Sequence, residues 1–244
     1  MKKVGVIIEA RTSSKRLPRK TLMKICERPS IELMIERVKR VKKISNIILA
    51  TTNKKCDNEL VEIAKKQGVE FFCGSEDDVL SRVLLAAQKF SIDIIVSLQG
   101  DSILIDPKCV DDAIEFFFDN NFDYVSSALS NTFPIGMETQ VFTRSVLEKV
   151  DKLTKVPVDR EHVTLFIYKN PEMFSVSEIK ASKKFRRPEL NLVLDEREDF
   201  ELIRKIFEEL YFSNPEFSLI DIINFLDLNP NIKKINSMIN RTIV

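Results

Sequence analysis

VGVIIEARTSSKRLPRK, residues 4–20, joins an apolar strand pattern to a strongly basic segment. Val4 to Ile8 is rich in β-branched residues, which is typical of a buried strand. The segment after it cannot form a core element, because its cations would repel one another on any helix face. A cationic loop at the carboxyl end of a first α/β strand favours an anion, and we expect a nucleoside triphosphate. A solvated basic turn is the alternative. The cations are Arg11, Lys15, Arg16, Arg19 and Lys20.

Strand and helix patterns alternate through the first half of the chain. Strand patterns cover residues 4–10, 46–52, 69–73 and 93–100, and helical apolar spacing covers residues 29–41, 57–66 and 77–90. Parallel strands need such crossover connections, whereas a tight turn suffices for antiparallel ones. The alternation therefore predicts the α/β class, a Rossmann-like, mainly parallel sheet with helices on both faces.

The second half is less regular. A helix is expected over residues 107–118 behind an Asp106 cap, a short one over 160–168 and a long one over 196–210. Strand patterns cover residues 122–128, 138–143, 174–180 and 190–195. No Gly/Ser-rich linker separates the halves. We expect a single domain over residues 1–244, with an inserted lobe at about 130–185.

The composition excludes several classes of protein. The 38 basic and 37 acidic residues nearly cancel, so no overall field favours nucleic acid or an anionic membrane as partner. The four cysteines are widely separated and there is one histidine, which argues against zinc and against a disulfide framework. No apolar run reaches the about 18–20 residues of a membrane span, and no signal peptide is evident. We expect a cytoplasmic protein.

Two carboxylates are placed to bind a metal ion. Asp101 follows the strand pattern of LQGDSILIDP (98–107), and Asp195 ends LNLVLD (190–195). Carboxylates at the carboxyl ends of parallel strands face the ligand crevice, and Mg²⁺ bound to phosphate needs one or two of them. Each has an alternative role, since Asp101 could sit in a tight turn and Asp195 could cap the following helix.

The order ARTSSKRLPRK, LQGD and LVLDEREDFE resembles the cytidylyltransferases that activate 2-keto sugar acids, namely the Kdo and nonulosonate CMP-sugar synthetases. The SpsF-like spore-coat polysaccharide branch is indicated by CGSEDDVLSR (73–82), DYVSS (123–127), FPIGMETQVF (133–142) and REHVTLFIYKNPEMF (160–174). The resemblance covers nearly the whole chain. It implies a nucleotide-diphospho-sugar-transferase-like fold, a Mg²⁺-dependent reaction of CTP with a sugar acid, pyrophosphate release and a homodimer.

The resemblance also implies roles for individual residues. Asp101 and Asp195 fall on the metal-binding carboxylates. Arg19 stands where the family often has glycine, which removes conformational freedom from the loop. We expect the side chains of Arg16 and Lys20 to contribute little to the core. The triphosphate signature falls on Arg11, Ser14, Arg16 and Lys20, of which Arg16 and Lys20 are, with Asp101, the candidate catalytic residues.

The region 133–168 is expected to recognise the acceptor, because polar residues there lie beside apolar runs. Arg160 is the candidate partner of an acceptor carboxylate, although a surface ion pair is the alternative. His162 is a candidate sugar contact rather than a general base. A phosphorylated sugar or alcohol as acceptor, and a catalytically silent nucleotide-binding protein, remain open. The candidate acceptor residues are Gln99, Glu138, Gln140, Arg160 and His162.

Overall fold

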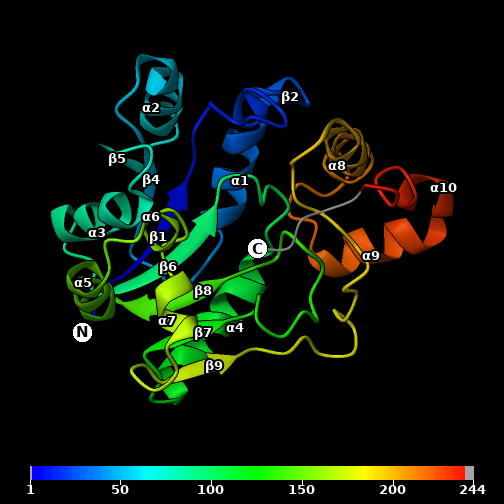
Figure 1. The fold of residues 1–244 in the computed structure, drawn as a ribbon. Coiled ribbons are helices and arrows are strands. Elements are labelled where there is room, and N and C mark those ends of the chain that lie inside the picture. Colours follow the sequence, from blue (N-terminus) through cyan, green and yellow to red (C-terminus); the bar gives the residue numbers. More distant parts are fainter. Residues whose placement is uncertain (1, 240–244) are drawn as a thin grey trace.

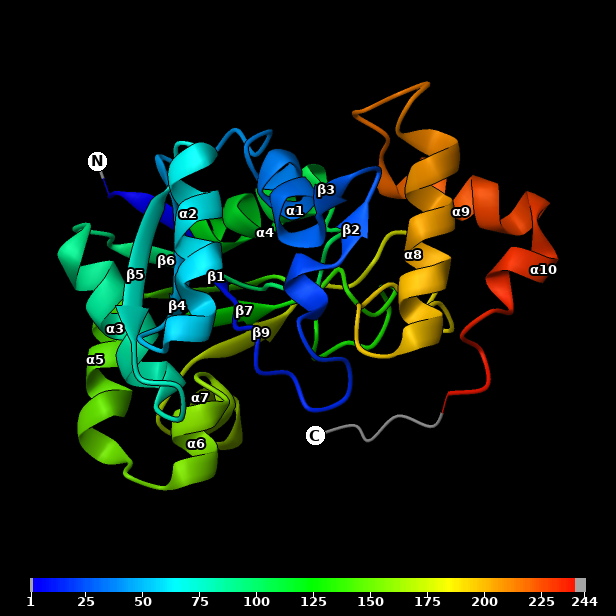
Figure 2. The same cartoon turned by 90° about the horizontal axis from the view of Figure 1, so that it is seen from above.

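A computed structural model describes residues 2–239 and shows a seven-stranded sheet between two layers of helices (Figures 1 and 2). The strand order is β5-β4-β1-β6-β8-β7-β9. The first four strands of the chain in this sheet pair in parallel: β1 (Val4–Glu9), β4 (Asn46–Thr52), β5 (Glu70–Gly74) and β6 (Ile94–Gln99). The predicted fold class is confirmed.

The other half of the sheet comes from the second half of the chain. Strand β8 (Gln140–Thr143) runs antiparallel to β6 and to β7 (Tyr124–Ser126), and β9 (Val176–Glu178) pairs in parallel with β7. In the register of β6 and β8, Ser97 lies opposite Gln140. Polar residues from the middle of the sheet therefore approach one another near the carboxyl end of β6.

Helices cover both faces, and each face has its own apolar core. One core packs beneath α1 (Ser30–Val38), α2 (Asn58–Lys66), α4 (Pro107–Asp119), α8 (Arg197–Leu210) and α9 (Leu219–Leu228). The opposite core packs beneath α3 (Val79–Lys89), α5 (Arg144–Leu153) and α7 (Leu165–Lys169). The predicted Asp106 cap is confirmed, because its carboxylate accepts hydrogen bonds from the backbone N–H groups of Lys108 and Cys109.

Two predicted elements differ in the structure. Residues 190–195 form no strand, because only an isolated bridge pairs Asn191 with Ile135. Their apolar alternation instead buries Leu190, Leu192 and Leu194 in the core while the backbone runs as a connection. The helix expected over 160–168 is two short helices, α6 (Pro157–Glu161) and α7, separated at Val163 with φ 36°.

Several short elements carry no clear sequence pattern. The hairpin of β2 (Lys24–Ile25) and β3 (Arg28–Pro29) turns through Cys26 and Glu27, both at positive φ without the usual glycine. The 3-10 helices η1 (Lys20–Leu22) and η2 (Lys55–Asp57) and the terminal helix α10 (Pro230–Lys233) were likewise not expected.

Candidate active site

The basic loop, residues 10–19, leaves the carboxyl end of β1 and ends where η1 begins. Its two ends are joined by a hydrogen bond from the Arg19 N–H to the Thr12 carbonyl oxygen, 3.0 Å long. Arg19 has φ 60°, the left-handed conformation that glycine adopts without strain. Arg19 thus adopts a backbone conformation that usually requires glycine, and the Cβ of its side chain makes that conformation strained.

Lys20 lies between the two predicted metal carboxylates. Its Nζ is 2.5 Å from Asp101 Oδ2 and 2.7 Å from Asp195 Oδ1. The other oxygen of Asp195, Oδ2, lies 2.8 Å from Arg16 Nη2. Burial alone would lower the pKa of Lys20, but the two carboxylates raise it on balance. The expectation that the loop cations contribute little to the core is wrong for Lys20, whose side chain is buried and paired.

Gly100 brings Asp101 close to the first strand. A Cβ at Gly100 would lie 2.7 Å from Ala10 Cβ and 3.0 Å from the Glu9 carbonyl oxygen, so a larger residue would push the two strand ends apart. Asp101 Oδ1 is buried and makes no hydrogen bond within residues 2–239. One oxygen of this carboxylate therefore binds Lys20 and the other is left for a further ligand.

Asp195 is not the cap of helix α8. The N-cap is Glu196, which forms a capping box with Asp199, and the Asp195 N–H itself donates to Asp199 Oδ2. The Asp195 carboxylate is thereby left to the site. Asp195 therefore does not cap helix α8, and its role as a metal ligand stays a prediction.

Two cavities meet at Asp195, which lines both of them. The smaller, about 400 Å³, lies along the basic loop, and the larger, about 620 Å³, extends over the sheet toward α7. The smaller is lined by Arg11, Ser14, Arg16, Lys20 and Asp101, and also by Arg82, which the sequence analysis missed. The residues that line both cavities are Glu9, Arg16, Gln99, Glu161, His162 and Asp195.

Four of the five predicted acceptor residues line the larger cavity: Gln99, Glu138, Gln140 and His162. Arg160 does not, which corrects its predicted role. Its guanidinium binds Asp78 at 2.9 and 2.6 Å and Asp151 at 2.6 Å, so it joins α3 to α5 and α6 instead of meeting an acceptor. The next two residues, Glu161 and His162, do line the cavity, because α6 ends there.

The floor of the larger cavity is a polar band across three strands. Glu9 Oε1 accepts a hydrogen bond of 2.5 Å from Ser97 Oγ, and Gln140 accepts one of 2.8 Å from Thr164 Oγ1. Burial raises the pKa of Glu9, and it raises the pKa of Glu138 to about 7. The sequence does not single out Glu9, because a charged residue at a strand end is an ordinary surface feature.

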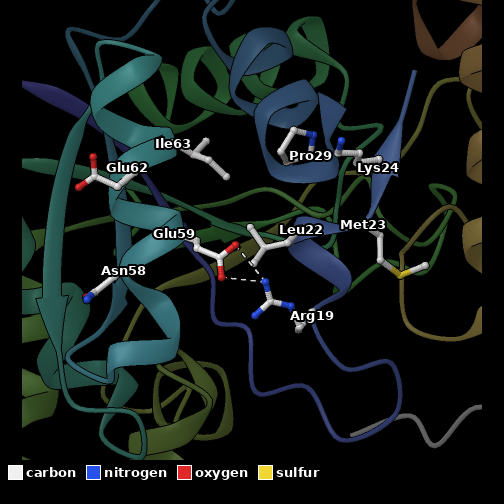
Figure 3. Close-up of a pocket in the computed structure, with 9 residues that line it drawn as sticks. All are labelled: Arg19, Leu22, Met23, Lys24, Pro29, Asn58, Glu59, Glu62 and Ile63. Carbon is white, nitrogen blue, oxygen red and sulfur yellow. Dashed lines mark hydrogen bonds and ion pairs between the residues drawn. The ribbon is translucent and has the colours of Figure 1, made fainter. Parts of the chain in front are cut away.

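A third cavity, about 560 Å³, lies on the outer side of the basic loop, between η1, the β2–β3 hairpin and α2 (Figure 3). Leu22, Met23 and Ile63 supply apolar walls. Arg19 closes one side by donating hydrogen bonds of 2.8 and 3.0 Å to Glu59 of α2. The carboxyl-terminal end of the basic loop therefore contacts α2 through this ion pair.

The residues present fit a hard divalent cation. Asp101 and Asp195 converge on one cationic nitrogen, and the unpartnered Asp101 Oδ1 offers a further oxygen. Within the described chain no cluster of three or more His, Cys, Asp or Glu side chains could hold a metal. Two carboxylates are nevertheless enough for Mg²⁺, which commonly completes its shell with water and substrate phosphates.

The sheet and its helices have the Rossmann-like fold of solved nucleotidyltransferases. The chain belongs to the cytidylyltransferase family, whose sequence model matches residues 5–218. The predicted resemblance to CMP-sugar cytidylyltransferases with an SpsF-like branch is confirmed by the relatives described next.

A solved cytidylyltransferase from Leptospira borgpetersenii is 35% identical, with TM-score 0.91 and full coverage of both chains. An uncharacterized protein of Methanocaldococcus jannaschii is 42% identical over 97% of this chain and 95% of its own. The spore coat polysaccharide biosynthesis protein SpsF of Bacillus subtilis is 30% identical over 95% and 97%, respectively. The 3-deoxy-manno-octulosonate cytidylyltransferase of Chloroherpeton thalassium is 27% identical over 75% of this chain and 71% of its own.

None of the helices within residues 2–239 has the length and apolar character that a membrane span requires.

Proposed function

We propose that this cytidylyltransferase transfers CMP from CTP to a 2-keto sugar acid of the Kdo or nonulosonate type, with Mg²⁺ as cofactor and release of pyrophosphate. The observation that carries the proposal is the convergence of Lys20 and Asp101, which line the smaller cavity, on Asp195, which lines both cavities. A triphosphate in the smaller cavity and a sugar in the larger one would meet beside Asp195. Surface polysaccharide biosynthesis is the proposed role, by analogy with the SpsF relative.

The basic loop supplies most of the catalytic charge. Arg11 and Arg16 can each grip phosphate oxygens through a planar pair of N–H donors, and Ser14 adds a hydroxyl. Lys20 is a compact charge that can follow the leaving pyrophosphate. Because attack and departure at the α-phosphorus are in line, the main task of these side chains is to position the reactants and neutralise charge.

Asp101 and Asp195 would hold Mg²⁺. When bound, the ion supplies charge neutralisation at the phosphate and lowers the pKa of the attacking hydroxyl. Lys20 keeps the two carboxylates together in the free protein, and the triphosphate competes with them for its Nζ. The same lysine can therefore exchange carboxylate partners for phosphate oxygens as substrate binds.

The charge of the larger cavity favours a sugar acid over a phosphorylated acceptor. Its lining includes the carboxyl groups of Glu9, Glu138, Glu161 and Asp195, whereas Arg16 is the only lysine or arginine that lines it in the described part of the chain. A phosphomonoester brings about −1.5 to −2 charges, against one for a carboxylate. A carboxylate therefore meets less repulsion from this lining than a phosphomonoester does, and Gln99 and Gln140 can bind hydroxyl groups.

The test is pyrophosphate release with CTP, Mg²⁺ and a panel of acceptors. We expect release with one or more 2-keto sugar acids, and none with sugar phosphates. In a thermal-shift assay with Mg²⁺, CTP should stabilise the protein more than UTP, ATP or GTP, because binding to the folded state shifts the unfolding equilibrium. Release with sugar phosphates alone would overturn the acceptor class, and equal shifts from all four nucleotides would overturn the choice of CTP.

A further inference from the structure

The basic loop contains no helix or strand over residues 10–19, so its shape depends on contacts with the body of the protein. Ordering such a segment costs roughly 1–2 kcal/mol per residue in backbone entropy. A loop that is ordered before the substrate arrives avoids that cost during binding. The side chains that order this loop therefore affect its affinity for a ligand without touching the ligand.

Asp57 makes the central contact with the loop. Its Oδ1 accepts hydrogen bonds from the Thr12 N–H at 2.8 Å and from Thr12 Oγ1 at 2.6 Å. Its Oδ2 accepts a hydrogen bond from Thr52 Oγ1, at the end of β4. Asp57 and Thr12 are only 1% and 4% exposed, so these bonds are shielded from water.

The carboxylate of Asp57 is turned away from its own helix. Asp57 occupies the N-cap position of α2, yet its side chain makes no capping hydrogen bond there. An N-cap aspartate typically contributes about 1 kcal/mol to helix stability through that bond. The residue forgoes this contribution and binds the loop instead, which indicates that the loop contact is the role of the side chain.

Asp57 itself pairs with none of the cations of residues 11–20 in the described chain. Within residues 2–239 it forms no ion pair, and its hydrogen-bond donors are neutral groups, apart from a weak contact with Cys56 Sγ. By contrast, Glu76 pairs with Arg11 at 3.9 Å and accepts a hydrogen bond from Ser13 Oγ at 2.5 Å. Asp57 thus fixes the base of the loop through Thr12 without neutralising Arg11, Arg16 or Lys20.

We propose that Asp57 is a positioning residue for cytidylyl transfer, which holds the basic loop through Thr12 in the shape that binds the triphosphate. The inference rests on the proposed role of this loop as the triphosphate site. Thr12 directly follows Arg11 and lies two residues before Ser14, so a shift of its backbone would move both of these proposed phosphate-binding side chains.

The test compares three hydroxyl variants. Thr12→Val removes the 2.6 Å bond to Asp57 but keeps the backbone bond, so the protein should still fold. Thr12→Ser restores the hydroxyl. Thr52→Val is the matched control, because it removes a bond to the other oxygen of the same carboxylate from a residue of β4 that does not belong to the loop. Trypsin cleavage after Lys15 and Arg16 in the folded protein reports loop order, and calorimetry with CTP and with tripolyphosphate reports binding.

We expect Thr12→Val to bind CTP and tripolyphosphate at least tenfold more weakly and to be cleaved in the loop several times faster. Thr12→Ser should behave as the natural protein does. Thr52→Val should lower the melting temperature to a similar extent while leaving loop cleavage and CTP affinity unchanged. If the two valine variants are indistinguishable, or if Thr12→Val retains full affinity and loop protection, the inference is overturned.

Arg16→Ala separates this inference from the proposed function. If Arg16→Ala weakens CTP binding and Thr12→Val does not, the loop binds triphosphate and the positioning role of Asp57 is overturned. If neither variant weakens CTP binding, the triphosphate role of the loop is overturned as well.

Discussion

Replacing Lys20 with methionine removes the cation between two carboxylates while nearly preserving side-chain length. Both carboxylate oxygens lie within hydrogen-bond distance of the same nitrogen, at 2.5 and 2.7 Å, so they are no more than about 5 Å apart. At that separation two negative charges repel by about 3 kcal/mol at an effective dielectric constant of about 20, an upper figure because exposed Arg16 still pairs with Asp195 in the variant. The side chains of Lys20, Asp101 and Asp195 are 11%, 16% and 14% exposed, so water screens this repulsion only in part.

We therefore expect Lys20→Met to lose up to about 3 kcal/mol of unfolding free energy in a chelating buffer. For a chain of this length that corresponds to about 6–12 °C in melting temperature. The pKa of Lys20 is raised in the folded protein, so its contribution is fully present below its unfolded pKa of about 10.5 and is lost as the pH rises through the folded value. A measurement at pH 7.5 thus detects the whole effect.

Divalent ions should rescue the variant, because Mg²⁺ or Mn²⁺ can bind the two carboxylates once the ammonium group no longer competes for them. The assay is thermal unfolding with and without chelator, combined with Mn²⁺ binding measured by electron paramagnetic resonance without CTP. Lys15→Met is the matched control, since Lys15 is an exposed cation of the same loop without an ion pair in the described chain. An unchanged melting temperature in chelator, or equal Mn²⁺ binding by both variants, would refute the reasoning.

Three further experiments, with four substitutions, test other parts of the site. Asp195→Asn should abolish most pyrophosphate release, and circular dichroism should show no loss of helix. Glu196→Ala should lower the free energy of unfolding by about 1 kcal/mol, because it removes the N-cap of α8. The reverse pattern would return the capping role to Asp195. Burial raises the pKa of Glu138 from 4.5 to about 7, so folding is increasingly opposed as the pH rises from about 4.5 to 7. Glu138→Gln should therefore stabilise the protein at pH 8, by up to about 3 kcal/mol, and not at pH 4; equal effects at both pH values would contradict that cause. Arg19→Gly relieves the strained backbone and loses only an exposed ion pair with Glu59, so its melting temperature should stay level or rise, and a clear fall would show that the pair outweighs the strain.

The sequence by itself determined the elements whose signals are local. Apolar runs separated by helical spacing were enough for the α/β class, because parallel strands need those crossovers. The cap at Asp106 follows from the proline directly after it, and the basic loop follows from its concentrated charge. Asp101 could be placed at the ligand edge because it directly follows a buried strand.

Only the tertiary structure decided which partners the polar side chains meet. Lys20 contacts carboxylates 81 and 175 positions away, and Asp57 holds a threonine 45 positions away. Arg160 was assigned to the acceptor from its neighbours in sequence, but the packing of α3 against α5 and α6 gives it Asp78 and Asp151 instead. Long charged side chains bind whichever opposite charge the fold brings near. Which charge that is depends on contacts between elements far apart in the chain, and local periodicity contains no information on those contacts.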